Sequence, residues 1–169
     1  RILRGRRNIF SIRSTDSFGG GHDFGDWYVR MPQSANSRTG CFATVLRMLR
    51  GRRVSSILCV PFHNEELLTS IAIKECFDAP LCAYIMDDQN IAVDVVPDDL
   101  MREFLKKCSL RLATHPELRS AYEDKYGLKF YLLPAVAPDH LMETQPSGSL
   151  GGRLEPKTCA LVGSFWDQG

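Results

Sequence analysis

The spacing of apolar residues changes repeatedly along the chain, and these changes predict strands and helices in turn. Short, continuous apolar runs such as VSSILCVPF indicate buried strands, whereas apolar residues that recur every three or four positions indicate helices. The predicted strands cover residues 8–13, 54–62, 80–86, 110–114 and 129–134. The predicted helices cover residues 39–49, 64–77, 97–108 and 115–127. From residue 54 to residue 134 the two kinds of element alternate.

This alternation predicts the fold class. Strands that are apolar throughout, without a polar face, indicate a sheet that is buried on both sides. We therefore predict an α/β fold with a Rossmann-like parallel sheet flanked by helices. In the helix over 39–49, Phe42, Val45, Leu46 and Leu49 share one face. In such sheets ligands bind beyond the carboxyl ends of the strands, so the candidate chemistry is expected there.

Two of these strand ends carry glycine or histidine. After the first predicted strand, Gly19, Gly20 and Gly21 would let backbone amides approach a phosphate or a sugar hydroxyl. Their spacing fits neither the dinucleotide motif nor the P-loop motif, and a flexible loop is the alternative. The second strand ends at His63, which could act as an acid, a base or a hydroxyl partner. His63 could equally cap the helix that begins at Asn64.

The next strand ends in the polar sequence MDDQN, which places Asp87, Asp88 and Gln89 in a row. Adjacent carboxylates can hold a divalent metal, orient hydroxyl groups or cap a helix. Strand alternation sends the two aspartates in opposite directions, which argues against joint action. One strand later, Thr114 is a natural helix N-cap, with Glu117 at the capping-box position.

Composition narrows the class of protein. The chain has 169 residues, enough for one well-packed domain, and is 44% hydrophobic and 24% charged, as in ordinary globular proteins. No apolar run approaches the ~18 residues of a membrane helix, and no secretory signal pattern is present. The six cysteines form no C-x-x-C pair, which argues against a zinc site. We interpret them as reduced thiols in a cytoplasmic protein.

Charge is distributed unevenly along the chain. Residues 1–60 hold eleven arginines and three aspartates, a net +8, whereas the remainder holds ten Lys or Arg and seventeen Asp or Glu, a net −7. A solvated basic face is one interpretation. The alternative is peripheral contact of the basic N-terminal region with a membrane surface or with phosphate. Nucleic acid is not expected, because no basic helix with interleaved aromatic residues follows.

The order of these pieces resembles the N-terminal domain of GT-B glycosyltransferases of the retaining group 1, or family four, type. The resemblance covers residues 54–169 and, more weakly, the glycine stretch. In ILCVPFHNEELLTSIAIKECFDAPLCAYIMDD a strand ending in histidine precedes a helix and a strand ending in aspartate, as in the family. CSLRLATHPELRSAYEDKYGLKFYLLPAVAPDHL resembles the family's next segment, and CALVGSFWDQG resembles the first strand of its second domain.

The resemblance implies a domain organisation and an activity. Residues 1–142 would be the acceptor-side domain, 143–157 an interdomain linker, and 158–169 the start of a truncated donor-binding domain. The full-length enzyme would transfer a sugar from a nucleotide-sugar donor to a hydroxyl of a sugar, polysaccharide or lipid-linked acceptor, and the fragment alone would be inactive. Neither a cofactor nor a metal is implied. The implied catalytic residues are Asp87 and His63, and the implied substrate-binding residues are Gly19, Gly20, Gly21, Asp88 and Gln89.

Two departures from the family pattern keep other functions open. Met86 stands where the family has a histidine, and Ala135–Val136 replaces its asparagine–glycine. Because a thioether cannot hydrogen-bond as an imidazole does, the role of that histidine is absent or has moved to Asp87 or Asp88. A non-catalytic α/β binding module is therefore one alternative. A metal-dependent enzyme that uses both aspartates as ligands is the other.

Overall fold

The computed structural model describes residues 8–13, 25–31 and 37–135. The chain divides into two units between Ala135 and Val136, and all of the described residues belong to the first. The predicted linker and the predicted start of a second domain lie outside the described residues, as do Gly19, Gly20 and Gly21.

A four-stranded parallel sheet forms the centre of this unit, which confirms the predicted α/β, Rossmann-like class. Each strand pairs with the next along the chain, so the sheet order is β3-β4-β5-β6. The strands are β3 (Ile57–Cys59), β4 (Leu81–Ile85), β5 (Leu110–Ala113) and β6 (Tyr131–Leu132). The first of these is shorter than the predicted strand over 54–62, and Pro61, which has no backbone N–H, lies just beyond it.

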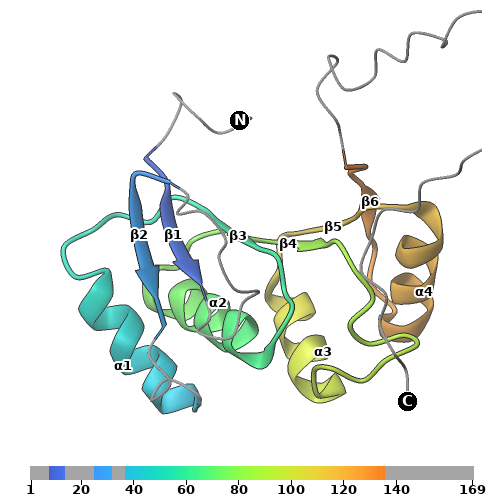
Figure 1. Ribbon diagram of the computed structural model, residues 1–169, viewed down its shortest axis with the longest axis horizontal. Coiled ribbons are helices and arrows are strands. Elements are labelled where there is room, and N and C mark those ends of the chain that lie inside the picture. Colours follow the sequence, from blue (N-terminus) through green and yellow to red (C-terminus); the bar gives the residue numbers. More distant parts are fainter. Residues whose placement is uncertain (1–7, 14–24, 32–36, 136–169) are drawn as a thin grey trace, which may run out of the picture. The chain divides into compact units, whose positions relative to one another are not determined.

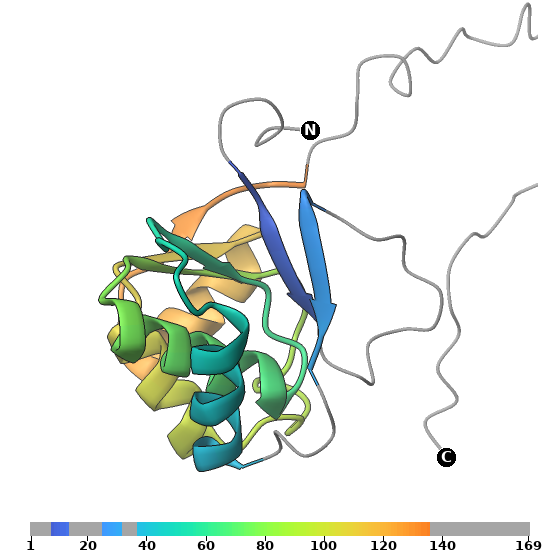
Figure 2. The ribbon, with the colours of Figure 1, turned by 90° about the vertical axis from the view of Figure 1, so that its left-hand side faces the viewer.

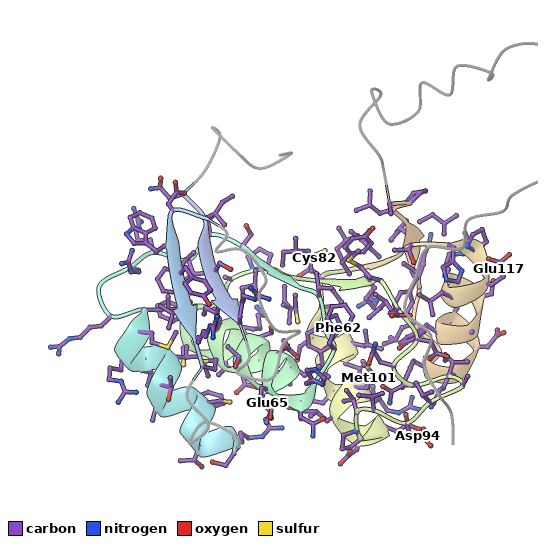
Figure 3. All side chains as sticks on the ribbon, in the orientation of Figure 1. Phe62, Glu65, Cys82, Asp94, Met101 and Glu117 are labelled. Atoms are coloured by element: carbon purple, nitrogen blue, oxygen red, sulfur yellow. The ribbon has the colours of Figure 1, made fainter. Side chains whose placement is uncertain are left out.

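The helices between these strands all lie on one face of the sheet (Figures 1 and 2). Right-handed crossovers that step in the same direction each time place every connecting helix on the same side. These helices are α2 (Asn64–Phe77), α3 (Asp98–Lys107) and α4 (Pro116–Tyr126). Their bounds lie within one residue of the predicted ones. Met101 of α3 lies on this helix side (Figure 3).

The ends of these helices follow from local sequence. Two acidic residues open α3 and two lysines close it, which suits the helix dipole. Pro116 occupies the first turn of α4, where its missing N–H has no consequence. The helix ends at Gly127, whose φ of +67° is favourable for glycine.

A second, two-stranded parallel sheet joins β1 (Phe10–Arg13) to β2 (Trp27–Arg30). The sequence pattern did not predict β2, although its β-branched and aromatic residues favour a strand. Just before it, Gly25 has a φ of +99°, and a Cβ there would lie 2.8 Å from the Ile9 carbonyl oxygen. The Asp26 carboxylate accepts the Ile9 N–H at 2.7 Å, so a hydrogen bond to Ile9 holds the residue that precedes β2.

Helix α1 (Arg38–Met48) follows and packs against α2. Its N-cap is Ser37, whose hydroxyl accepts the Gly40 N–H at 3.1 Å. The shared apolar face of this helix is buried only in part. Val45 and Leu49 are buried, but Leu46 is 53% exposed, and Cys41 and Thr44 are also buried.

One continuous hydrophobic core lies between the main sheet and its helices. From the sheet it takes the side chains that point toward the helices, including Leu81, Ala83 and Ile85, all fully buried. The expectation that both faces are buried is wrong for the residues described. Leu58 is 55% exposed, Leu110 39% and Tyr131 48%, because the described helices cover only one face. Among the described helices, none is long and apolar enough to cross a membrane.

Candidate functional site

The carboxyl ends of β3 and β4 meet at one edge of the sheet. The two strands are parallel neighbours, with Ile57 paired to Leu81 and Cys59 to Ala83. His63 follows the end of β3 by four residues, and Asp87 follows the end of β4 by two. The structure thus places both residues beyond the same edge, where ligands bind in open parallel sheets.

His63 lies at the junction between β3 and α2 (Figure 3 labels its neighbours Phe62 and Glu65). It is half-buried and occupies the N-cap position with an extended backbone, at φ −137° and ψ 167°. Its backbone N–H donates to Glu66 Oε2 at 2.6 Å, which is the returning bond of a capping box. His63 therefore takes the capping position that the sequence left open, and a role of its imidazole in chemistry stays a prediction.

Asp87 and Asp88 have different environments. Asp87 is exposed, and one of its oxygens, Oδ1, accepts the N–H of Asp88 at 3.0 Å. Asp88 accepts three backbone N–H groups, from Asn90 at 3.1 Å, Ile91 at 2.7 Å and Ala92 at 2.8 Å. These bonds use both oxygens of Asp88, which shape the loop that follows β4. Of these two carboxylates, Asp87 is the one more open to a ligand.

The loop between β4 and α3 is anchored by Asn90, which is fully buried. Its side-chain amide donates to the Val96 carbonyl at 2.5 Å and to Asp98 Oδ1 at 3.1 Å. Lys125 of α4 donates to the Asn90 carbonyl and lies 2.9 Å from the Asp98 carboxylate. Asn90 therefore ties the loop that contains Asp87 to α3 and α4.

Electrostatics at this anchor favour an ionised Asp98. The hydrogen bond from Lys125, with further bonds from Asn90 and Tyr126, lowers the pKa of Asp98 to about 2. The neighbouring Tyr122 is buried, and burial raises the pKa of its hydroxyl to about 12. Near neutral pH the anchor therefore combines a carboxylate with neutral phenols, and this charge state holds the loop in place.

The end of β5 contributes two polar residues to the same edge. The Thr114 N–H donates to the Ile85 carbonyl and its hydroxyl to the Met86 carbonyl, both at 3.2 Å. The predicted N-cap role of Thr114 is wrong, because His115 caps α4 by accepting the Leu118 N–H at 3.3 Å. Thr114 thus ties the β4 end, next to Asp87, to β5. The sequence did indicate this position, because the polar residues Thr114 and His115 directly follow the strand.

The remaining candidates are not brought together by the described structure. Gln89 is buried, and its carbonyl accepts the Val95 N–H at 2.9 Å inside the loop. The three glycines lie outside the described residues, so substrate binding by them stays a prediction. Among the described residues, no three His, Cys, Asp or Glu side chains form a group that could hold a metal ion.

Cys59, Cys76, Cys82 and Cys108 are free thiols. Burial raises the pKa of the Cys59 thiol to about 12 and raises the pKa of Cys108 as well, so neither is a reactive thiolate near neutral pH. They fill the core as small apolar side chains. The chain matches no protein-family model, no curated protein and no solved structure.

The edge therefore combines two imidazoles, an exposed carboxylate and a hydroxyl on three adjacent strand ends. Imidazole and carboxylate groups can accept a proton from a hydroxyl group or hold it in place by hydrogen bonds. These groups can form hydrogen bonds with a ligand that carries hydroxyl groups.

Proposed function

We propose that the residues described here form the acceptor-side domain of a two-domain glycosyltransferase. The observation that carries the proposal is the position of His63 and Asp87 beyond the carboxyl ends of two adjacent parallel strands. The order of strands and helices from residue 57 to residue 132 supports it, because it is the order that the family resemblance implies.

In the proposed reaction, the bond between the sugar's anomeric carbon and the diphosphate oxygen of the donor breaks. A new bond forms from that carbon to the acceptor oxygen, and the nucleoside diphosphate leaves with the bonding electrons. The acceptor hydroxyl loses its proton. In the proposal, Asp87 and His63 bind and orient the acceptor hydroxyl, and one of them accepts this proton.

The donor's diphosphate would be held largely by a second domain, which the resemblance places after residue 157. On this proposal residues 1–169 alone do not transfer sugar, because donor and acceptor must be held together in a reactive geometry. Calorimetric titration of UDP-glucose, UDP-N-acetylglucosamine, GDP-mannose and ADP-glucose should detect no tight binding to residues 1–169. Tight binding of a donor to this chain alone would contradict the two-domain assignment.

The sharpest test of the site is Asp87→Asn in the natural gene product that contains these residues. Loss of a positioned acid–base or hydrogen-bonding group lowers turnover by roughly 10²–10⁴-fold. Asp94→Asn is the matched control, because Asp94 is an exposed aspartate in the same loop. Asp88→Asn is a poorer control, since Asp88 holds three backbone N–H groups, but we expect it to lower turnover less than Asp87→Asn.

Sugar transfer would be measured with the donor that binds, alongside thermal unfolding of each variant. Equal turnover for wild type and Asp87→Asn, with folding unchanged, would reject the role of Asp87. Equal losses in Asp87→Asn and Asp94→Asn would point to the loop's charge instead of to one carboxylate.

The two other functions receive less support. A metal site built on both aspartates conflicts with the three backbone bonds that Asp88 already accepts. A non-catalytic binding module remains compatible with Met86 at the strand end. It predicts acceptor binding without turnover, which the same assay would reveal.

A further inference from the structure

The C-terminal end of α1 and the turn after it carry a concentrated basic charge. We call the four residues Arg47, Arg50, Arg52 and Arg53 the arginine turn, and all four are exposed. The sequence from residue 27 to residue 64 holds six arginines, no lysine and no acidic residue, a net +6. The arginine turn therefore lies in a stretch that provides it with no neutralising carboxylate.

Internal structure accounts for only part of this charge. Arg47 lies in the last turn of α1, where a cation suits the helix dipole, but that effect fades beyond the last turn. Within the described part of the chain, the side chains of Arg47, Arg50 and Arg53 make no hydrogen bond or ion pair. By contrast, Arg38 at the other end of the helix is paired with Glu103. The charge of the arginine turn is thus available to an external anion.

Exposed apolar groups lie beside these arginines. Leu46 is 53% exposed and lies in the last turn of α1, beside Arg47 of the same turn and four positions ahead of Arg50 in the sequence. The Arg52 guanidinium lies 4.7 Å from the centre of the Trp27 ring and 5.0 Å from that of Phe10. Trp27 itself is 42% exposed. Arginines interspersed with an exposed leucine and tryptophan are typical of surfaces that lie in the headgroup region of a membrane.

We propose that the arginine turn, with Leu46 and Trp27, binds the surface of an anionic lipid membrane. The arginines contact lipid phosphates, for which their planar groups are well suited. Leu46 and the Trp27 ring enter the boundary between headgroups and acyl chains. Each arginine near an anionic surface strengthens binding roughly fivefold, so four together contribute several hundredfold.

A membrane explains this surface better than nucleic acid does. Single-stranded nucleic acid is bound by aromatic rings with a free face, on which bases stack. Here the Arg52 guanidinium lies over the Trp27 ring, where a stacking base would have to displace it, and the most exposed apolar neighbour is an aliphatic leucine, which offers no stacking surface. The inference does not depend on sugar transfer, so either proposal can fail while the other stands.

Vesicle sedimentation with residues 1–169 tests the proposal. The vesicles would contain phosphatidylcholine alone, or phosphatidylcholine with phosphatidylglycerol. We expect binding only to the anionic vesicles, and Arg50→Glu with Arg53→Glu to weaken it by roughly 30-fold or more. The matched control is Lys106→Glu with Lys129→Glu, which changes net charge equally at two exposed lysines outside this surface. It should weaken binding far less.

Two further measurements complete the test. Leu46→Ser should weaken vesicle binding several-fold without changing net charge. If circular dichroism shows that the double glutamate variant is not folded, the double variant Arg50→Gln with Arg53→Gln takes its place. Absence of binding to anionic vesicles, or equal losses in the arginine and lysine pairs, would overturn the proposal. So would tighter binding of a single-stranded DNA oligonucleotide than of the anionic vesicles, measured by fluorescence anisotropy.

Discussion

The two faces of the main sheet differ although both are apolar. The face toward α2, α3 and α4 is closed, with Leu81, Ala83 and Ile85 fully buried. On the opposite face, Leu58 and Leu110 are exposed, and Cys82 pairs with both of them in register. Residues one position apart on the same strand therefore have opposite environments.

This difference shows what an apolar strand pattern can establish. Apolar residues on both faces predict that both faces are suited to burial. They do not say which other segment provides the cover. Along β3 to β6 each crossover steps the same way, so α2, α3 and α4 accumulate on one side. Within the described residues, the second face keeps its apolar character without a helix over it.

The largest expected effect comes from making the same leucine-to-alanine substitution on each face of the sheet. Leu81→Ala removes a fully buried side chain and should lower the free energy of unfolding by about 2–5 kcal/mol. Leu58→Ala, on the neighbouring strand but on the open face, should change it by no more than about 0.5 kcal/mol. Urea unfolding followed by circular dichroism would measure both.

If Leu58→Ala lowers the free energy of unfolding as much as Leu81→Ala does, the two faces do not differ in burial as described. That result would mean that the open face is covered in solution, by the chain or by a partner. Concentration-dependent stability of the wild type would then distinguish a second copy from cover within one chain.

A smaller effect concerns two cysteines on the two faces. Burial raises the pKa of Cys59 to about 12, so roughly one thiol in 10⁴ is ionised at pH 8, whereas Cys82 is only half-buried on the open face. Burial also raises the pKa of Cys82. We expect iodoacetamide to modify Cys82 at least tenfold faster than Cys59 in the folded protein, with peptide mass spectrometry as the measurement.

Similar modification rates for the two cysteines would mean that iodoacetamide reaches both faces of the sheet equally well. Labelling in denaturant supplies the control, because the two thiols should then react at nearly the same rate. A protected Cys82 in the native protein would again indicate that something covers the open face.

Much of the fold could be predicted from the sequence because the signals were local. The bounds of α2 agree with the prediction, since acidic residues mark its start and the apolar spacing runs to Phe77. Gly127 marks the end of α4 in the same way. Which side of α1 is buried does not follow from local sequence. Leu46 fits the apolar spacing, but the neighbouring α2 decides which stripe is buried, and it covers Cys41 and Thr44 instead.

The candidate site also combines features that local sequence predicts with features that depend on distant contacts. That His63 and Asp87 follow neighbouring strands could be inferred from the order of elements. The different use of Asp87 and Asp88 could not, because it depends on how the loop turns back to offer three N–H groups to Asp88. The link from Thr114 to Met86 joins residues 28 positions apart, beyond the reach of any capping pattern.

The smallest expected effect concerns the charges that hold the helices of the closed face together. Arg38 of α1 donates to both oxygens of Glu103 on α3, and Lys107 of α3 pairs with Glu75 of α2 at 2.5 Å. The hydrogen bond from Arg38 lowers the pKa of Glu103 below its ordinary value of 4.5. Because the folded-state pKa is the lower one, this stabilisation is present above about pH 4.5 and is lost as the pH falls below it.

Acid should therefore loosen the helix layer before it affects the open face. Between pH 5 and pH 3 the wild type should lose the stabilisation from the Arg38–Glu103 pair, which Glu103→Gln lacks at every pH. We expect this loss to be no more than about 1 kcal/mol, because the pair is partly exposed. Asp124→Asn, at an exposed carboxylate without an ion pair among the described residues, serves as the control. Thermal unfolding across this pH range would measure all three proteins. A Glu103→Gln profile parallel to that of the wild type would show that the bond to Arg38 does not hold α1 to α3.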